Sequence, residues 1–180
     1  AGWLGMEVDV VLSAVKKAGG AIERLPPVKM NLTDPILVLE REVLKVKLQM
    51  PELAPSWVDL EAAAFSFPLY NQLRVLIDQQ SELNIQELIN KADSNELKSL
   101  ITELTVEPIR TDGEVSDRYI TSIFARLREV ALSRLIAEIK STLQRLNPVE
   151  NEAQYQEIFT KLVGMEAARR VQKELALGES

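Results

Sequence analysis

The chain has 180 residues, of which 46% are hydrophobic and 27% charged, a balance typical of one globular domain. It contains no histidine and no cysteine, which excludes imidazole catalysis, the usual zinc sites and disulfide bonds. The net charge is −6 without a large basic face, so a nucleic-acid binder is not expected, and no apolar run approaches the roughly 20 residues that span a membrane.

The composition favours helices throughout. Aromatic residues make up only 5% of the chain, and the abundant residue types are strong helix formers. No segment shows the alternating pattern of a β-strand. We therefore expect an all-α fold, and the absence of cysteine fits a cytoplasmic protein.

The N-terminal segment reads as an appendage to the main domain. Residues 7–18 predict a short helix that ends at Gly19-Gly20, a typical C-terminal cap. Pro26-Pro27 then prevents a helix from continuing, because proline lacks the amide donor. We expect a linker over 19–33, so that 1–33 forms a tail and a linker.

The first helix of the main domain is expected to start at Thr33-Asp34-Pro35. This triplet combines a capping side chain with a proline near the first helical position. An apolar face then continues up to Pro51. Glu40 and Glu42 fall on different faces of this helix, and we expect both to be exposed to solvent.

A group of large apolar side chains follows within fourteen residues, and we expect it to fill the core around a short helix. The group comprises Trp57, Leu60, Phe65, Phe67, Leu69 and Tyr70. Further helices are predicted from about Leu69, from about Ile85, and after Asp93, where Glu96 completes the spacing of a capping box. These elements predict a helical bundle over 34–130.

Ser116 is expected to cap the longest helix, which keeps helical spacing for about thirty residues, or about 45 Å. Its first half can pack on the bundle. Its second half needs another partner, which a returning helix from Glu152 to Leu177 can supply. The short connection at Asn147-Pro148-Val149 predicts an antiparallel helical hairpin over 131–180.

Few residues suggest chemistry. Carboxylates near Gly113 (Glu107, Asp112, Glu114 and Asp117) could hold a divalent cation, but the alternating spacing of a calcium loop is absent. A solvated loop before a helix explains them better. We expect no catalytic residue, no metal and no cofactor.

Two features of the hairpin point to a protein partner. Tyr155, Phe159, Leu162 and Met165 share one face, either as the seam of the hairpin or as a surface for a partner. Arg169-Arg170 could pair with acidic groups of a partner, or with nearby glutamates of the same helix. Both alternatives stay open for each feature.

Several blocks along 34–180 resemble the C-terminal helicase-binding domain of bacterial replicative primase (DnaG), in its actinobacterial form. They occur in the family's order: EVLK at 42–45, QMPELA at 49–54, AF at 64–65 with Pro68 and Tyr70, ELTVEP at 103–108, RYI at 118–120 and LQRLNPVE at 143–150. Residues 1–24 resemble the end of the preceding RNA-polymerising core.

The resemblance implies a non-catalytic domain of a larger primer-making enzyme. It implies a bundle that stimulates the hexameric replicative helicase (DnaB), and a hairpin that docks on the helicase's N-terminal domains. The resemblance places the helicase contact on the hairpin, and the residues that we expect to make it are Ile139, Leu143, Tyr155, Phe159, Leu162, Arg169 and Arg170. An alternative is the N-terminal domain of the helicase itself, which has a similar bundle and hairpin.

Some relatives also bind the acidic tail of single-stranded-DNA-binding protein through basic residues near the start of the first bundle helix. Here that stretch, 35–40, is apolar and acidic, and the cations Arg41, Lys45 and Lys47 follow it. No direct contact with nucleic acid or membrane is expected.

Overall fold

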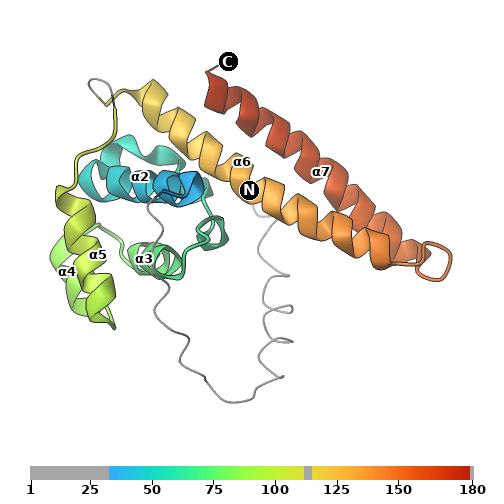
Figure 1. Ribbon diagram of the computed structural model, residues 1–180, viewed down its shortest axis with the longest axis horizontal. Coiled ribbons are helices and arrows are strands. Elements are labelled where there is room, and N and C mark those ends of the chain that lie inside the picture. The colour runs from blue at the N-terminus through green and yellow to red at the C-terminus, as the bar shows by residue number, and fades with distance from the viewer. Residues whose placement is uncertain (1–32, 112–114, 179–180) are drawn as a thin grey trace. The chain divides into compact units, whose positions relative to one another are not determined.

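The computed structural model describes residues 33–111 and 115–178, which belong to one compact unit over Asn31–Ser180. Figure 1 labels the α-helices, and the described ranges contain no strand. The expected all-α fold is therefore confirmed. The helix predicted at 7–18 and nearly all of the linker at 19–33 lie outside the described residues.

Helix α2 (Pro35–Gln49) is the central element of the bundle. Asp34 caps it, with Oδ1 accepting a hydrogen bond from the Ile36 amide at 2.8 Å, as the sequence predicts. Val43, Leu44 and Val46 are completely buried. Because α3, α5 and α6 all pack against α2, residues on every side of its second half are buried, including charged ones.

The aromatic segment after α2 forms three short 3-10 helices rather than one short helix: η1 (Pro51–Leu53), η2 (Pro55–Asp59) and η3 (Ala62–Ala64). Prolines at the first position of η1 and η2 explain the interruptions, because each lacks the amide that a continuing helix needs. The predicted core role is confirmed for five of the six residues, whereas Leu69 is half-buried. The rings of Trp57 and Phe65 lie 6.1 Å apart, and those of Phe67 and Tyr70 lie 5.1 Å apart.

Three further helices complete the bundle: α3 (Pro68–Asp78), α4 (Ile85–Lys91) and α5 (Asn95–Val106). The capping box proposed from Asp93 is shifted by one residue. Ser94 is the cap, because its hydroxyl accepts a hydrogen bond from the Leu97 amide at 3.2 Å. This places Leu97, Leu100, Ile101 and Leu104 on the buried side of α5.

Helix α6 (Asp117–Arg145) runs continuously for 29 residues after its predicted cap, Ser116. Its first half packs on the bundle through Ile120, Phe124 and Leu127, all buried. A bond from the Arg134 guanidinium to the Ala64 carbonyl extends this contact past the middle of the helix.

Helix α7 (Glu152–Leu177) has the predicted bounds and returns along α6 as an antiparallel partner (Figure 1). The half-buried positions of α7 recur every three or four residues, which marks one side of a helix. They are Tyr155, Ile158, Leu162, Met165, Glu166, Arg169, Gln172, Leu175 and Ala176. No residue of α7 is fully buried, so the helix is held along one side only.

At the open end of the hairpin, a hydrogen bond joins α6 to α7. The Ser122 hydroxyl of α6 donates to the Ala176 carbonyl of α7 at 2.7 Å. Gly178 ends α7 in the left-handed conformation, with φ of 73°. A Cβ at this position would lie 2.8 Å from the Arg118 guanidinium, so glycine also allows this close approach.

Candidate protein-docking surface

The apolar residues expected on the hairpin divide between its seam and its surface. Ile139 and Leu143 of α6 and Leu162 of α7 are half-buried at positions that follow the seam spacing. Ile136, only 3% exposed, lies in the same series on α6. These seam residues hold the two helices together, so they shape the hairpin more than they present a surface.

Phe159 is the exposed member of the aromatic pair. Its side chain is 46% exposed, whereas Tyr155 is half-buried. The two rings stack with centroids 6.4 Å apart and planes only 7° from parallel. Tyr155 thus supports the Phe159 ring from the tip side. The exposure of Phe159 leaves its ring accessible to a partner, whereas Tyr155 lies closer to the seam.

Sequence reasoning missed Val163, which is 54% exposed one turn after Phe159. Its spacing of four residues from Phe159 was the available signal. An exposed valine beside an exposed phenylalanine gives α7 an apolar patch that no described residue covers. Such patches are typical of partner-binding surfaces.

The two arginines predicted at a partner contact have different surroundings. Arg169 pairs with Glu166 at 2.8 Å, and Lys140 of α6 reaches the same carboxylate at 2.7 Å. The hydrogen bond from Lys140, with Arg169 nearby, lowers the pKa of Glu166. Arg170 is exposed and has no ion pair within the described residues. Of these two arginines, Arg170 is therefore the one available to a partner's acidic group.

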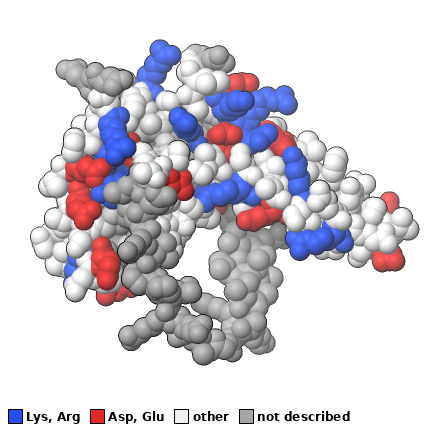
Figure 2. Space-filling view, viewed as in Figure 1, with Lys and Arg blue, Asp and Glu red and all other residues white. Residues whose placement is uncertain are grey.

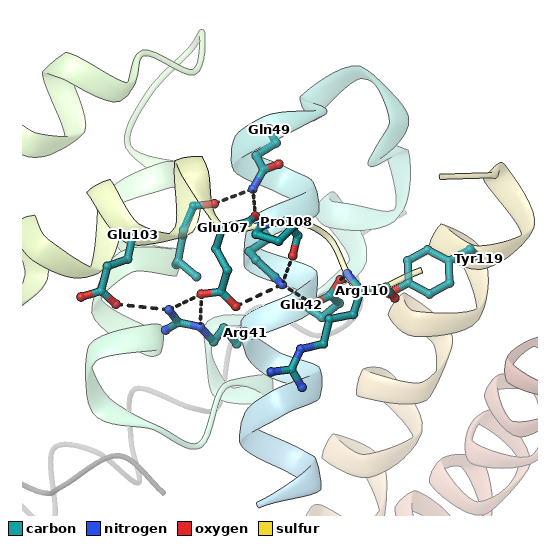
Figure 3. Close-up of polar contacts among 10 residues, drawn as sticks. Arg41, Glu42, Gln49, Glu103, Glu107, Pro108, Arg110 and Tyr119 are labelled. Carbon is teal, nitrogen blue, oxygen red and sulfur yellow. Dashed lines mark hydrogen bonds and ion pairs between the residues drawn. The ribbon is translucent and has the colours of Figure 1, made fainter. Parts of the chain in front are cut away.

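A largely buried polar cluster links α2 to α5, to the segment after α5 and to the first turn of α6 (Figure 3). Arg41 of α2 donates to Glu107 at 2.9 Å and 2.5 Å and to Glu103 at 3.2 Å. Burial lowers the pKa of Arg41, but hydrogen bonds with Glu107, Tyr70 and Glu103 outweigh it and raise that pKa overall. The same bond from Arg41 lowers the pKa of Glu107. The Glu107 carboxylate is thus ionised and paired with neighbouring cations of the same domain.

The expectation that Glu40 and Glu42 face solvent is wrong. Glu40 is completely buried and accepts hydrogen bonds from the amide and hydroxyl of Ser66 at 2.8 and 2.6 Å. Glu42 is 5% exposed and lies 2.6 Å from the Lys45 ammonium. Both glutamates are buried because other helices surround α2, so the sides of α2 that carry charged residues are covered as well.

Lys45 and Glu42 tie α2 to the segment that leads into α6. The Lys45 ammonium, fully buried, also donates to the Pro108 carbonyl at 2.8 Å. Glu42 accepts from the Arg110 amide and, at 3.1 Å, from the Tyr119 hydroxyl in the first turn of α6. Burial, together with the charge of Glu42, raises the pKa of Tyr119. The cluster thereby fixes where α6, and with it the hairpin, leaves the bundle.

Nothing in the described ranges suggests a reactive centre. No group of three or more acidic side chains gathers there in a way that could hold a metal ion. Among those same residues, no helix is both long and apolar enough to cross a membrane. A helical bundle that carries an exposed hairpin face defines a protein-interaction module.

The family follows from comparison with known proteins. A family model described as "DNA primase DnaG DnaB-binding" matches residues 40–158. The chain belongs to this family of primase domains.

Relatives and a solved structure agree with this assignment. DNA primase of Mycolicibacterium smegmatis is 36% identical over 99% of the chain, and that of Mycobacterium leprae is 40% identical over 81%. The chain spans only 32% and 24% of these curated relatives. The solved helicase-binding domain of primase from Mycobacterium tuberculosis is 40% identical, with a TM-score of 0.63, over 79% of this chain and 94% of that one.

Proposed function

We propose that this chain recruits primase to the replicative helicase DnaB by docking the α6–α7 hairpin on the helicase's N-terminal domains. The observation that carries the proposal is the position of α7. It packs on α6, buries none of its own residues fully, and leaves Phe159 and Val163 in solvent. A helix held on one side, with an apolar patch on another, is suited to receive a partner.

In this proposal the bundle and the hairpin have different roles. Residues 34–130 form the bundle subdomain, which stimulates the helicase, and residues 131–180 form the docking hairpin. Helix α6 crosses this division without interruption. Residues 1–33 would join the domain to the polymerising core of primase, so the chain itself would be non-catalytic and would act in the cytoplasm, where primers are made.

Within this proposal the seven hairpin residues take different roles. Phe159 and Arg170 would touch the helicase directly, because both side chains are exposed. Tyr155 would orient the Phe159 ring. The remaining residues would act through the shape of the hairpin, since they lie in its seam or pair within it: Ile139, Leu143, Leu162 and Arg169.

Two other expectations receive less support. The N-terminal domain of the helicase is not favoured, because the matching family and the relatives are primases. Binding of the acidic tail of single-stranded-DNA-binding protein would have to rely on Lys47, because the contacts of Arg41 and Lys45 are inside the buried cluster.

The proposal is tested by measuring binding of the chain to the full-length hexameric helicase. Phe159→Ala is expected to weaken binding by about tenfold, as truncation of an aromatic anchor commonly does. Val75→Ala serves as a matched control, because Val75 is also an exposed apolar side chain (41%) but belongs to α3 of the bundle. Equal affinity of wild type and Phe159→Ala, or loss of binding in the control alone, would exclude the hairpin as the docking site.

A further inference from the structure

One face of α7 joins apolar and cationic side chains in a single line. Phe159, Val163, Arg170 and Lys173 are all exposed. They follow one another at spacings of four, seven and three residues, which place them on the same side of an α-helix. We call these four residues the outer face of α7.

The cationic end of this face borders a hollow of about 240 Å³ between α6 and α7. Its lining residues are Glu129, Glu166, Arg169, Arg170 and Lys173. Glu166 is already neutralised by Lys140 and Arg169. Glu129 is near the Ser133 hydroxyl, at 3.3 Å.

Two cations on this face have no charged partner among the residues that the structure describes. Among the described residues, Arg170 and Lys173 form no hydrogen bond and no ion pair. Figure 2 shows Lys and Arg side chains along the hairpin, interspersed with Asp and Glu, and mainly uncharged atoms toward the tip. Two cations on one rim of a hollow, beside an apolar patch, are complementary to a partner with both apolar and acidic groups.

Helix geometry gives the spacing that the partner must match. Arg170 and Lys173 follow Val163 by seven and ten residues, which corresponds to about 10 and 15 Å along the axis. An amphipathic helix can present an apolar patch and carboxylates at this separation on one side. A helix that lies along another helix is also recognised through such repeated anchors.

We propose that the outer face of α7 receives an acidic amphipathic helix of the helicase, with its apolar side chains against Phe159 and Val163 and its carboxylates opposite Arg170 and Lys173. This inference rests on the proposed function, and it specifies the helicase surface that would bind: a helix with an apolar side and carboxylates. Because the cations are exposed, the charged part of the contact should weaken as salt increases.

The test compares charge reversals on two sides of the same helix. Arg170→Glu/Lys173→Glu and Lys161→Glu are made in the full chain, and affinity for the full-length helicase is measured between about 50 and 400 mM NaCl. Lys161 is a matched control, because it is exposed on α7 but lies away from the outer face and has no ion pair within the described part of the chain. Helix content of each variant is checked by circular dichroism.

The double reversal is expected to weaken binding by about tenfold or more at low salt and by much less at high salt, whereas Lys161→Glu changes affinity less than about twofold. The double reversal changes the net charge by −4 and Lys161→Glu changes it by −2. If Lys161→Glu loses about half as much binding free energy as the double reversal, or more, only the overall charge matters and the inference fails. It also fails if the double reversal binds like wild type while Phe159→Ala does not, although the proposed function then stands. If the wild-type chain does not bind the helicase, the proposed function itself fails.

A second copy of the chain is the competing occupant of this face. Sedimentation of the wild-type chain and the double reversal distinguishes the two. A monomer in both cases supports a helicase helix as the occupant. A dimer that the double reversal dissociates would assign the outer face to self-association and overturn the inference.

Discussion

Replacing Lys45 by methionine tests the buried polar cluster most directly. The Lys45 ammonium lies 2.6 Å from Glu42, 3.3 Å from Glu107 and 2.8 Å from the Pro108 carbonyl, and the residue is completely buried. Methionine keeps a similar volume and removes the charge. Glu42, whose side chain is only 6% exposed, would then lose its nearest cation.

The expected loss of stability follows from what each partner retains. Removal of one member of a buried ion pair typically costs about 3–5 kcal/mol, because the other charge is left uncompensated. We expect a cost at the lower end of this range, because Glu107 still accepts hydrogen bonds from Arg41 and Glu42 still accepts one from the Tyr119 hydroxyl. We expect the free energy of unfolding to fall by about 3 kcal/mol, or the melting temperature by about 6–12 °C for a chain of this size.

Urea unfolding followed by circular dichroism measures this change, and Lys98→Met is the control, because Lys98 is exposed on α5. The double variant Lys45→Met/Glu42→Gln should be more stable than Lys45→Met alone, because it removes the orphaned charge. A loss below about 1 kcal/mol in Lys45→Met would refute the role given to the cluster.

Three further predictions concern stability and use urea or thermal unfolding. The Arg41 hydrogen bond lowers the folded-state pKa of Glu107, so ionised Glu107 stabilises the fold fully above the unfolded carboxyl pKa of about 4.3. This stabilisation is lost as pH falls through the folded-state pKa, and Glu107→Gln should make the free energy of unfolding less dependent on pH in that range. Ser116→Ala should cost about 1 kcal/mol through loss of the α6 cap, and a cost equal to that of Ser99→Ala on the exposed side of α5 would contradict the capping role. Leu127→Ala, at a completely buried position, should cost about 2–5 kcal/mol, whereas Leu135→Ala, 37% exposed, should cost clearly less; similar losses would contradict the packing of α6 on the bundle.

The helix boundaries could be predicted from the sequence because local residues decide them. Asp34 and Ser116 cap their helices through amides only two or three residues away. The spacing of apolar residues likewise identified α7 from Glu152 to Leu177. The shift of the α5 cap to Ser94 shows the limit of this reasoning, since two adjacent capping residues offer equivalent patterns.

The burial of Glu40 and Glu42 could not be predicted, because it depends on residues distant in the chain. Ser66 covers Glu40 from 26 residues away, and Tyr119 covers Glu42 from 77 residues away. Helical periodicity shows which side chains share a face, but not which faces meet another element. The same limit explains why Phe159 could not be separated from the seam residues beside it.

The attachment of α7 along one side has a consequence for its dynamics. Amide protons exchange with solvent when a segment opens locally, and segments with few buried contacts open at the lowest free energy. Helix α7 has no fully buried residue, whereas α2 has eight. Deuterium uptake should therefore be fastest in α7 and slowest in α2, and a protein laid along α7 would slow its uptake without greatly changing that of α2.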